Sequence, residues 1–159
     1  MNLQASYFSI GNSVEIIDWW LNPYRYNITS RLHNKDINVF WTKRAQQVLS
    51  SQSTSLIIEM QIYFSCVIKK RVLFHERSDS RELDSINVGL EFEHLQPLPI
   101  NGKISITSRS VQSGSCSPIE FAKNYPIIKE LTSASAKSMN PRILKIDYKN
   151  NQWQGVFTI

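Results

Sequence analysis

Glycine and cysteine are both scarce in this chain of 159 residues, and each scarcity argues against a class of site. Five glycines leave little room for a Gly-rich loop of the kind that cradles phosphates. Two cysteines, Cys66 and Cys116, are too few for a disulfide framework, and neither has a second cysteine at a metal-ligand spacing. A chain of this length can bury a sizeable core without disulfides or a bound metal, and its hydrophobic fraction of 42% is typical of a globular protein.

Long apolar runs are missing as well. No window approaches the roughly 18 consecutive apolar residues that a membrane-spanning helix needs. The N-terminal segment has neither a basic leader nor an apolar stretch of secretory length. We therefore expect a cytoplasmic protein without a membrane span.

Motifs that would identify an enzyme or a metal site do not occur. The three histidines, His33, His75 and His94, show no HExxH or HxH spacing, so we expect no metal and no cofactor. There is no GxSxG turn, and no pairing of serine or cysteine with histidine indicates nucleophilic catalysis. A non-enzymatic function is favoured, and the alternative is a small enzyme whose pocket is lined by the Trp and Tyr residues of 19–26.

Basic side chains outnumber acidic ones, 18 against 13, which gives a net charge of +5. The excess lies in residues 1–77, where nine basic residues accompany five acidic ones. Lys69, Lys70 and Arg71 form the densest basic run, so binding of nucleic acid through a basic sheet is one alternative. The favoured interpretation of this run is a charged break that protects a strand from edge-to-edge aggregation.

The clearest pattern is an alternation of apolar side chains from Leu56 to Phe74. Apolar residues occupy every second position from Leu56 to Ile68, which predicts a strand with one buried face. The basic run 69–71 interrupts this alternation and 72–74 resume it, so we expect one long strand that bends or bulges near its middle. A second alternating strand, 86–92, is expected to pair with it across the charged loop 75–84.

Other elements follow from weaker patterns. A third strand is expected over 103–111, and a closing hairpin over 142–148 and 153–159 with its turn at 149–152. Helices are expected over 39–49, with Asn38 as N-cap, and over 118–131. Residues 3–10 favour a strand, 14–21 a short helix and 133–140 a loop of small residues.

Together these elements predict an α+β fold in a single domain, 1–159. We expect a mainly antiparallel β-sheet with two or three flanking helices, and closure into a β-barrel remains open. Residues 1–55 are expected to form a helical extension that packs on a β-rich core, 56–159. Ile57 and Val67 put apolar side chains on the second face of the long strand, which would suit a homodimer contact or a cover by the chain's own helices.

The segment around the second strand resembles a known family. Residues 84–92 (DSINVGLEF), followed by 96–99 (QPLP) and 102–106 (GKISI), are similar to the middle of a PilZ domain. Residues 142–146 (RILKI) with 155–157 (GVF) resemble the closing hairpin of that family. PilZ domains are small β-barrels that bind cyclic di-GMP. The resemblance, over at most 56–159, therefore implies a regulatory or interaction module whose partner is cyclic di-GMP or a protein, with nucleic acid less favoured.

The binding residues that the resemblance implies lie in the charged loop and the turn after it. Two flexible arginines can grip phosphates and stack on guanine, and a tight turn supplies amides and short polar side chains. The implied site is Arg77, Arg81, Asp84, Ser85 and Gly89. Lys69, Lys70 and Arg71 are expected to be secondary anion contacts. No catalytic residue is assigned.

Overall fold

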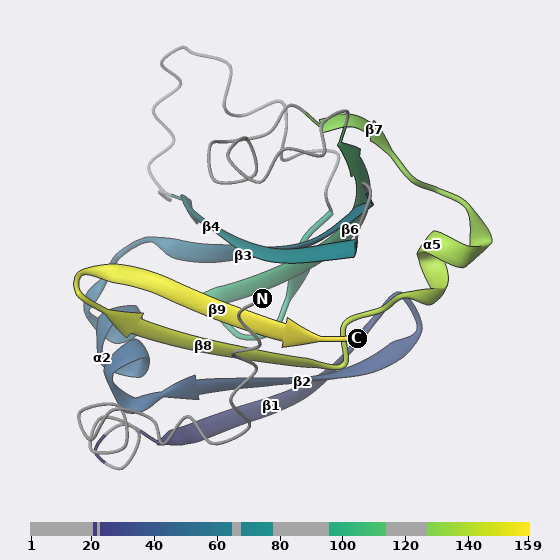
Figure 1. Cartoon of the computed structure of the whole chain (residues 1–159). Coiled ribbons are helices and arrows are strands. Elements are labelled where there is room, and N and C mark those ends of the chain that lie inside the picture. Colours follow the sequence, from purple (N-terminus) through teal and green to yellow (C-terminus); the bar gives the residue numbers. More distant parts are fainter. Residues whose placement is uncertain (1–20, 22, 65–67, 78–95, 114–126) are drawn as a thin grey trace, which may run out of the picture.

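The computed structural model describes residues 21, 23–64, 68–77, 96–113 and 127–159, which form two packed β-sheets with few helices (Figure 1). The four-stranded sheet has the order β1-β2-β8-β9, and the five-stranded sheet has the order β4-β3-β6-β5 with β7 also paired to β6. The first sheet consists of β1 (Tyr24–Leu32), β2 (Lys35–Thr42), β8 (Ile143–Lys149) and β9 (Gln152–Thr158). The second consists of β3 (Ser55–Phe64), β4 (Ile68–Arg77), β5 (Leu98–Pro99), β6 (Ile104–Ser113) and β7 (Ile127–Glu130).

The expectation of an α+β fold rich in antiparallel strands is confirmed. Each sheet nevertheless contains one parallel pair, β2 with β8 and β3 with β6. The described strands form two sheets rather than a closed barrel. Residues 24–42, which we expected within a helical extension, supply β1 and β2 and share a sheet with the C-terminal hairpin.

The prediction of one long strand over 56–74 is wrong, because the chain reverses within it. β3 and β4 form an antiparallel hairpin in which Phe64 pairs with Ile68 and Ile62 with Lys70. Facing residues of the two strands are an even number of positions apart, so even-numbered residues point to the same face of the sheet in both strands. The apolar alternation therefore looks continuous in the sequence although the chain reverses. The basic run 69–71 is therefore the start of β4 and not a bulge. The other neighbour of β3 is β6, and the expected partner strand, 86–92, lies outside the described residues.

Helix α2 (Lys43–Ser51) begins four residues later than we predicted. Residues 37–41 alternate between buried and more exposed positions and so belong to β2. Thr42, rather than Asn38, caps the helix, and its Oγ1 accepts a hydrogen bond from Ala45 N at 3.2 Å. Within the described residues, no helix combines the length and apolar character needed to cross a membrane.

The predictions for 118–131 and 133–140 are also corrected. The last part of the predicted helix forms β7, which pairs with β6, and its first part, 118–126, lies outside the described residues. The expected loop contains a short helix, α5 (Ala134–Ser138), capped by Ser133. The strand predicted over 3–10 and all but the last residue of the helix predicted over 14–21 also lie outside the described residues.

Two strand predictions near the C-terminal end are confirmed. The strand expected over 103–111 is β6, and the expected closing hairpin consists of β8 and β9. Asn150 and Asn151 form its two-residue turn with φ values of 53° and 59°. A type I′ turn requires positive φ at both positions, and Asn adopts that conformation more readily than most residues.

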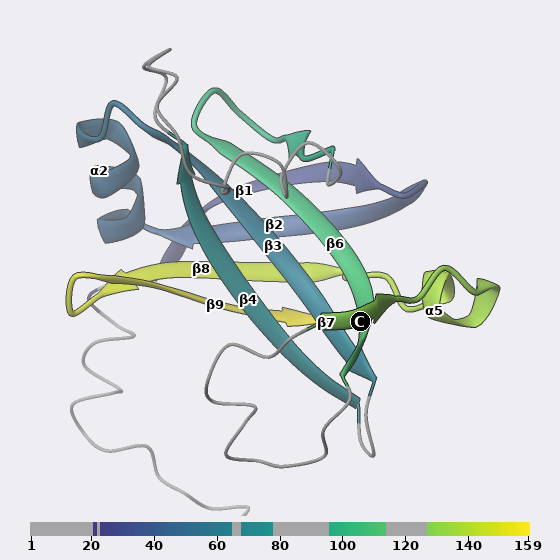
Figure 2. The same cartoon turned by 90° about the horizontal axis from the view of Figure 1, so that it is seen from above.

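The hydrophobic core lies between the two sheets, whose strands cross obliquely (Figure 2). Ala45 and Leu49 of α2 are buried in it, so this helix closes one end of the space between the sheets. On one side, β4 lies close to β9 at Gly155, where an added Cβ would stand 2.8 Å from Phe74 Cζ. Ile57, on the other face of β3, is buried within the single chain, and Val67 lies outside the described residues.

Candidate ligand-binding cleft

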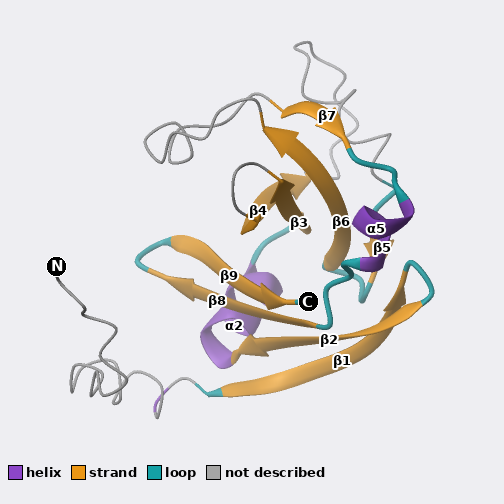
Figure 3. Ribbon diagram, turned by 45° about the vertical axis from the view of Figure 1, so that its right-hand side comes forward, coloured by secondary structure: helices purple, strands orange, loops and turns teal. Residues whose placement is uncertain are grey.

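The end of the molecule opposite α2 contains two adjoining cavities of about 430 and 340 Å³. Their described lining residues come from the β1–β2 hairpin, from residues 96 and 98 at β5, from β6 and from the segment that runs from β7 through α5. Figure 3 shows how these elements are arranged. Four of the described residues line both cavities: His33, Ser108, Arg109 and Glu130. We refer to the two cavities together as the cleft. Each has a volume within the roughly 300–1,000 Å³ that is usual for small-ligand pockets.

The cleft begins where the apolar face of β6 becomes polar. Ile104 and Ile106 are fully buried in the core, but the next two positions on that face are Ser108 and Ser110. At this edge β5 pairs with Ser105 and Ile106, and β7 pairs only from Val111 onward. Between those two partners, no described strand pairs with this edge of β6. The sheet therefore opens at the point where the core ends.

Two short connections position the other walls of the cleft. His33 and Asn34 form the two-residue turn between β1 and β2 with φ values of 49° and 65°, so the hairpin tip is tight. Lys35 Nζ donates a hydrogen bond to Ser138 O at 3.1 Å and thereby ties this hairpin to α5. From the other side, Ser110 Oγ donates to a carbonyl oxygen of α5 at 3.3 Å.

Among the described residues that line the cleft, positive charges outnumber negative ones. Arg109 lines both cavities, Lys137 lines the larger one and Arg31 lines the smaller one. Glu130 supplies the carboxylate that lines both. The cationic excess favours an anionic ligand.

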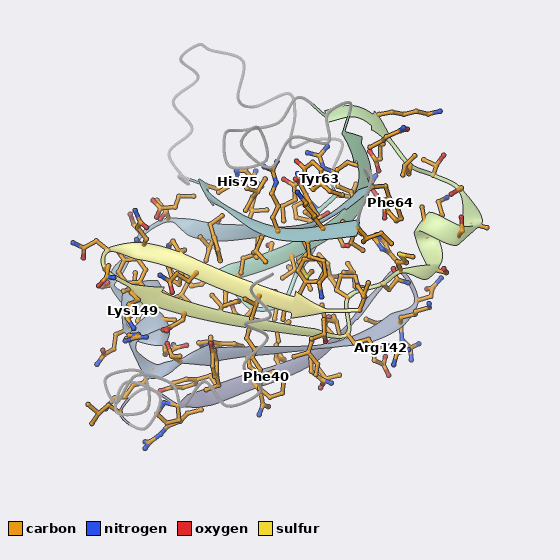
Figure 4. All side chains as sticks on the ribbon, viewed as in Figure 1. Phe40, Tyr63, Phe64, His75, Arg142 and Lys149 are labelled. Carbon is orange, nitrogen blue, oxygen red and sulfur yellow. The ribbon has the colours of Figure 1, made fainter. Side chains whose placement is uncertain are left out.

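Arg109 is held by a buried carboxylate on the outer face of the five-stranded sheet. Glu59 is only 2% exposed and lies on the face that points away from the core, as do Tyr63 and His75 (Figure 4). Its Oε1 accepts a hydrogen bond from Arg109 Nε, and its Oε2 lies 3.2 Å from His75 Nε2. The ion pair with Arg109 fixes one end of that guanidinium beside the cleft.

The network continues from Glu59 to β4. Gln61 Nε2 donates a hydrogen bond to Glu59, and Gln61 Oε1 accepts one from Arg71 Nε at 2.7 Å. The guanidinium of Arg71 also stands 4.6 Å from the centre of the Tyr63 ring, a cation–π distance. Side chains from three neighbouring strands are therefore connected across the sheet.

The charge state of Glu59 follows from these contacts. Burial alone would raise the pKa of its carboxyl, but the hydrogen bonds from His75 and Gln61, together with the charge and hydrogen bond of Arg109, outweigh that effect. The pKa of Glu59 is therefore lowered, and the folded protein holds it as a carboxylate. A second paired carboxylate, Asp147, has a lowered pKa for a related reason: hydrogen bonds from Arg44, Thr42 and Tyr148 N outweigh its burial.

Glu59→Gln should change how stability depends on pH. The lowered pKa means that the unfolded chain binds a proton at Glu59 before the folded chain does, so acid favours unfolding. The contribution of Glu59 is present above about pH 4.3, the ordinary glutamate value, and is lost as pH falls through the lower folded pKa. We expect Glu59→Gln to destabilise the protein at pH 7 and to cost clearly less at pH 3, as measured by urea denaturation.

The exposed Glu76→Gln is the matched control and should change stability little. A cost of Glu59→Gln that is equal at pH 7 and pH 3 would contradict the assignment of a stabilised carboxylate.

The predicted binding residues on β4 do not line the cleft. Lys69 and Arg71 lie on the outer face of the five-stranded sheet, whereas Lys70 points to the opposite side, with Nζ 5.8 Å from the centre of the Phe157 ring. Arg77 is exposed at the end of β4. Arg81, Asp84, Ser85 and Gly89 lie outside the described residues. The structure thus splits the basic run between two faces.

The aromatic pocket proposed for an enzyme is not assembled by the residues that the structure describes. Tyr26 stacks on Trp41 with ring centres 5.9 Å apart, and Lys145 Nζ stands 5.6 Å from the centre of the Tyr24 ring. Neither tyrosine lines the cleft, and Trp19 and Trp20 lie outside the described residues. Among the described residues there is also no cluster of His, Cys, Asp and Glu that could hold a metal ion.

The residues that build the cleft had only faint signals in the sequence. Glu59 and Gln61 stand between Ile57 and Tyr63 on the second face of β3, a polar pair in an otherwise apolar row. Arg109 could not be linked to Glu59 because they are brought together by a parallel pairing of distant strands. No family model matches the chain, and comparisons with curated proteins and with solved structures also gave no match.

Proposed function

We propose that this chain is a non-enzymatic binding module that takes a small anionic ligand into the cleft. The observation that carries the proposal is the position of Arg109, which lines both cavities while its Nε is paired with the buried Glu59. Its other guanidinium N–H groups make no hydrogen bond with any described residue. They are therefore available to a ligand oxygen.

The Arg109 side chain is already oriented before a ligand binds, which lowers the entropic cost of binding. A free arginine must lose much of its rotamer freedom when it grips an anion, but the Glu59 ion pair already orients the Arg109 side chain. Lys137 and Arg31 add positive charge around the cleft and would attract an anion before contact. Guanidinium groups bind both carboxylates and phosphates in this way.

Cyclic di-GMP is one anion to test, because the resemblance to PilZ domains implies it. That resemblance rests on residues 84–92 and their neighbours, and a regulatory role for the module remains part of the proposal. The cleft supports anion binding through described residues alone, since Arg109, Lys137 and Arg31 lie outside the segment 78–95.

Thermal melts of the full chain with inorganic phosphate, GMP, cyclic di-GMP and N-acetyl-alanylalanine test the proposal. A ligand present at 100 times its dissociation constant adds about 2.7 kcal/mol to stability, which raises the melting temperature by several degrees. We expect at least one of these anions to do so.

Lys137→Ala should weaken that ligand about fivefold in a calorimetric titration, because it removes one charge-assisted contact from the cleft. Lys43→Ala, on α2 at the opposite end of the molecule, is the control and should leave the dissociation constant unchanged. The proposal fails if none of the four anions binds at millimolar concentration, or if both variants weaken binding equally.

A further inference from the structure

Resting on the proposed function, we infer that the ligand is a small zwitterion of the dipeptide class, which carries an ammonium group as well as a carboxylate. Two side chains of the cleft, Glu130 and Asn140, lead to this inference. A simple anion would use Arg109 and Lys137 and would leave both of these groups in contact with water alone.

Glu130 offers a site for a positive charge. It lines both cavities together with Arg109, yet it forms no ion pair with that arginine or with any other described residue. Glu130 is exposed at the cleft, so its carboxylate is open to a ligand there, while Arg109 is paired with Glu59. A ligand with an ammonium group at one end and a carboxylate at the other can contact both at once.

Asn140 offers a site for an amide. Its side chain lines the larger cavity, the residue is nine-tenths buried, and its carboxamide makes no hydrogen bond with any described residue. The carboxamide is open to solvent at this cavity, so a ligand there can replace water as its hydrogen-bond partner. A carboxamide has both a donor and an acceptor, and a peptide bond presents the complementary pair.

The three contacts together specify a short peptide. Arg109 and Lys137 would bind the carboxylate, Asn140 the peptide bond and Glu130 the ammonium group. The two cavities share four lining residues, so an extended ligand can occupy both.

Calorimetric titration of the full chain with three matched ligands tests the inference. The ligands are alanylalanine, its N-acetyl form without the ammonium group and its C-terminal amide without the carboxylate. We expect alanylalanine to bind about tenfold more tightly than either derivative, since each derivative loses one charge-assisted contact.

Glu130→Gln identifies the group that recognises the ammonium. In this variant the preference for alanylalanine over the N-acetyl form should fall from about tenfold to about one, while the affinity for the N-acetyl form stays within twofold. Glu130 is exposed, so the substitution should leave the fold intact. Glu76→Gln, an exposed change on β4, is the control and should keep the full preference. Asn140→Leu should weaken all three ligands to a similar degree.

The outcomes separate this inference from the proposed function. If the N-acetyl form binds as tightly as alanylalanine, or if Glu130→Gln keeps the preference, the inference of a zwitterionic ligand fails. The proposed anion site is then unaffected. If phosphate or a nucleotide binds and no peptide does, the inference also fails alone. If no anion and no peptide binds, both fail.

Discussion

Arg109→Met should lower the free energy of unfolding by about 3 kcal/mol at neutral pH. The substitution keeps most of the apolar volume of the side chain but leaves Glu59, which is 2% exposed, without its cationic partner. Removing one member of a buried ion pair typically costs about 3–5 kcal/mol, and the partial exposure of Arg109 puts this pair at the low end. Urea denaturation would measure the cost as a lower midpoint.

Two comparisons make this prediction specific. Arg31→Met removes the exposed ion pair between Arg31 and Asp36 and should cost less than about 1 kcal/mol. The double variant Glu59→Leu/Arg109→Met should recover part of the loss, because no charge is then left buried at that position. An equal cost for Arg109→Met and Arg31→Met would show that Glu59 is not held by Arg109.

Ile146→Ala should cost about 3 kcal/mol because it opens a cavity in the middle of the core. Ile146 of β8 is fully buried and pairs with Trp41 across the parallel ladder and with Gly155 on β9. Replacing a buried isoleucine by alanine typically costs about 2–5 kcal/mol, more where the surroundings cannot collapse into the space. Urea denaturation should show a lower midpoint with an unchanged slope.

The matched control is Val156→Ala on the neighbouring strand. Val156 is 64% exposed, so its truncation should change stability by no more than about 0.5 kcal/mol. If the two variants were equally stable, the core would not lie where the two sheets face each other.

Local patterns predicted extended structure for β3, β4, β6, β8 and β9, but they missed β1, β2 and β7 and the reversal of the chain between β3 and β4. The closing hairpin and β6 were found because each combines alternation with recognisable turn residues. The hairpin of β3 and β4 was mistaken for one strand because an alternating pattern does not show whether the chain continues or reverses. Even-numbered residues also point to the same face in both strands, so the pattern is not interrupted. β2 was mistaken for the start of a helix because a short apolar run fits either period.

The cleft was not predictable for a different reason. Its described lining residues come from the β1–β2 hairpin, from residues 96 and 98 at β5, from β6 and from the segment that runs from β7 through α5, and they form no motif with their neighbours in sequence. The pairing of Glu59 with Arg109 depends on the register of a parallel ladder, in which Glu59 lies beside Thr107 and Gln61 beside Arg109. Registers between distant strands are set by the packing of the whole sheet and leave no local signal.

The two parallel ladders also determine the order in which this chain can fold. β2 obtains its second neighbour only from β8, whose first residue, Ile143, pairs with Asn38. During synthesis, the β1–β2 hairpin must therefore wait, with one side of β2 unpaired, until the residues from Ile143 onward have been made. Contacts between such distant segments slow folding, because the intervening loop must close before they can form. We therefore expect refolding on the millisecond-to-second scale typical of sheets with many long-range contacts, and completion of the four-stranded sheet late in the process.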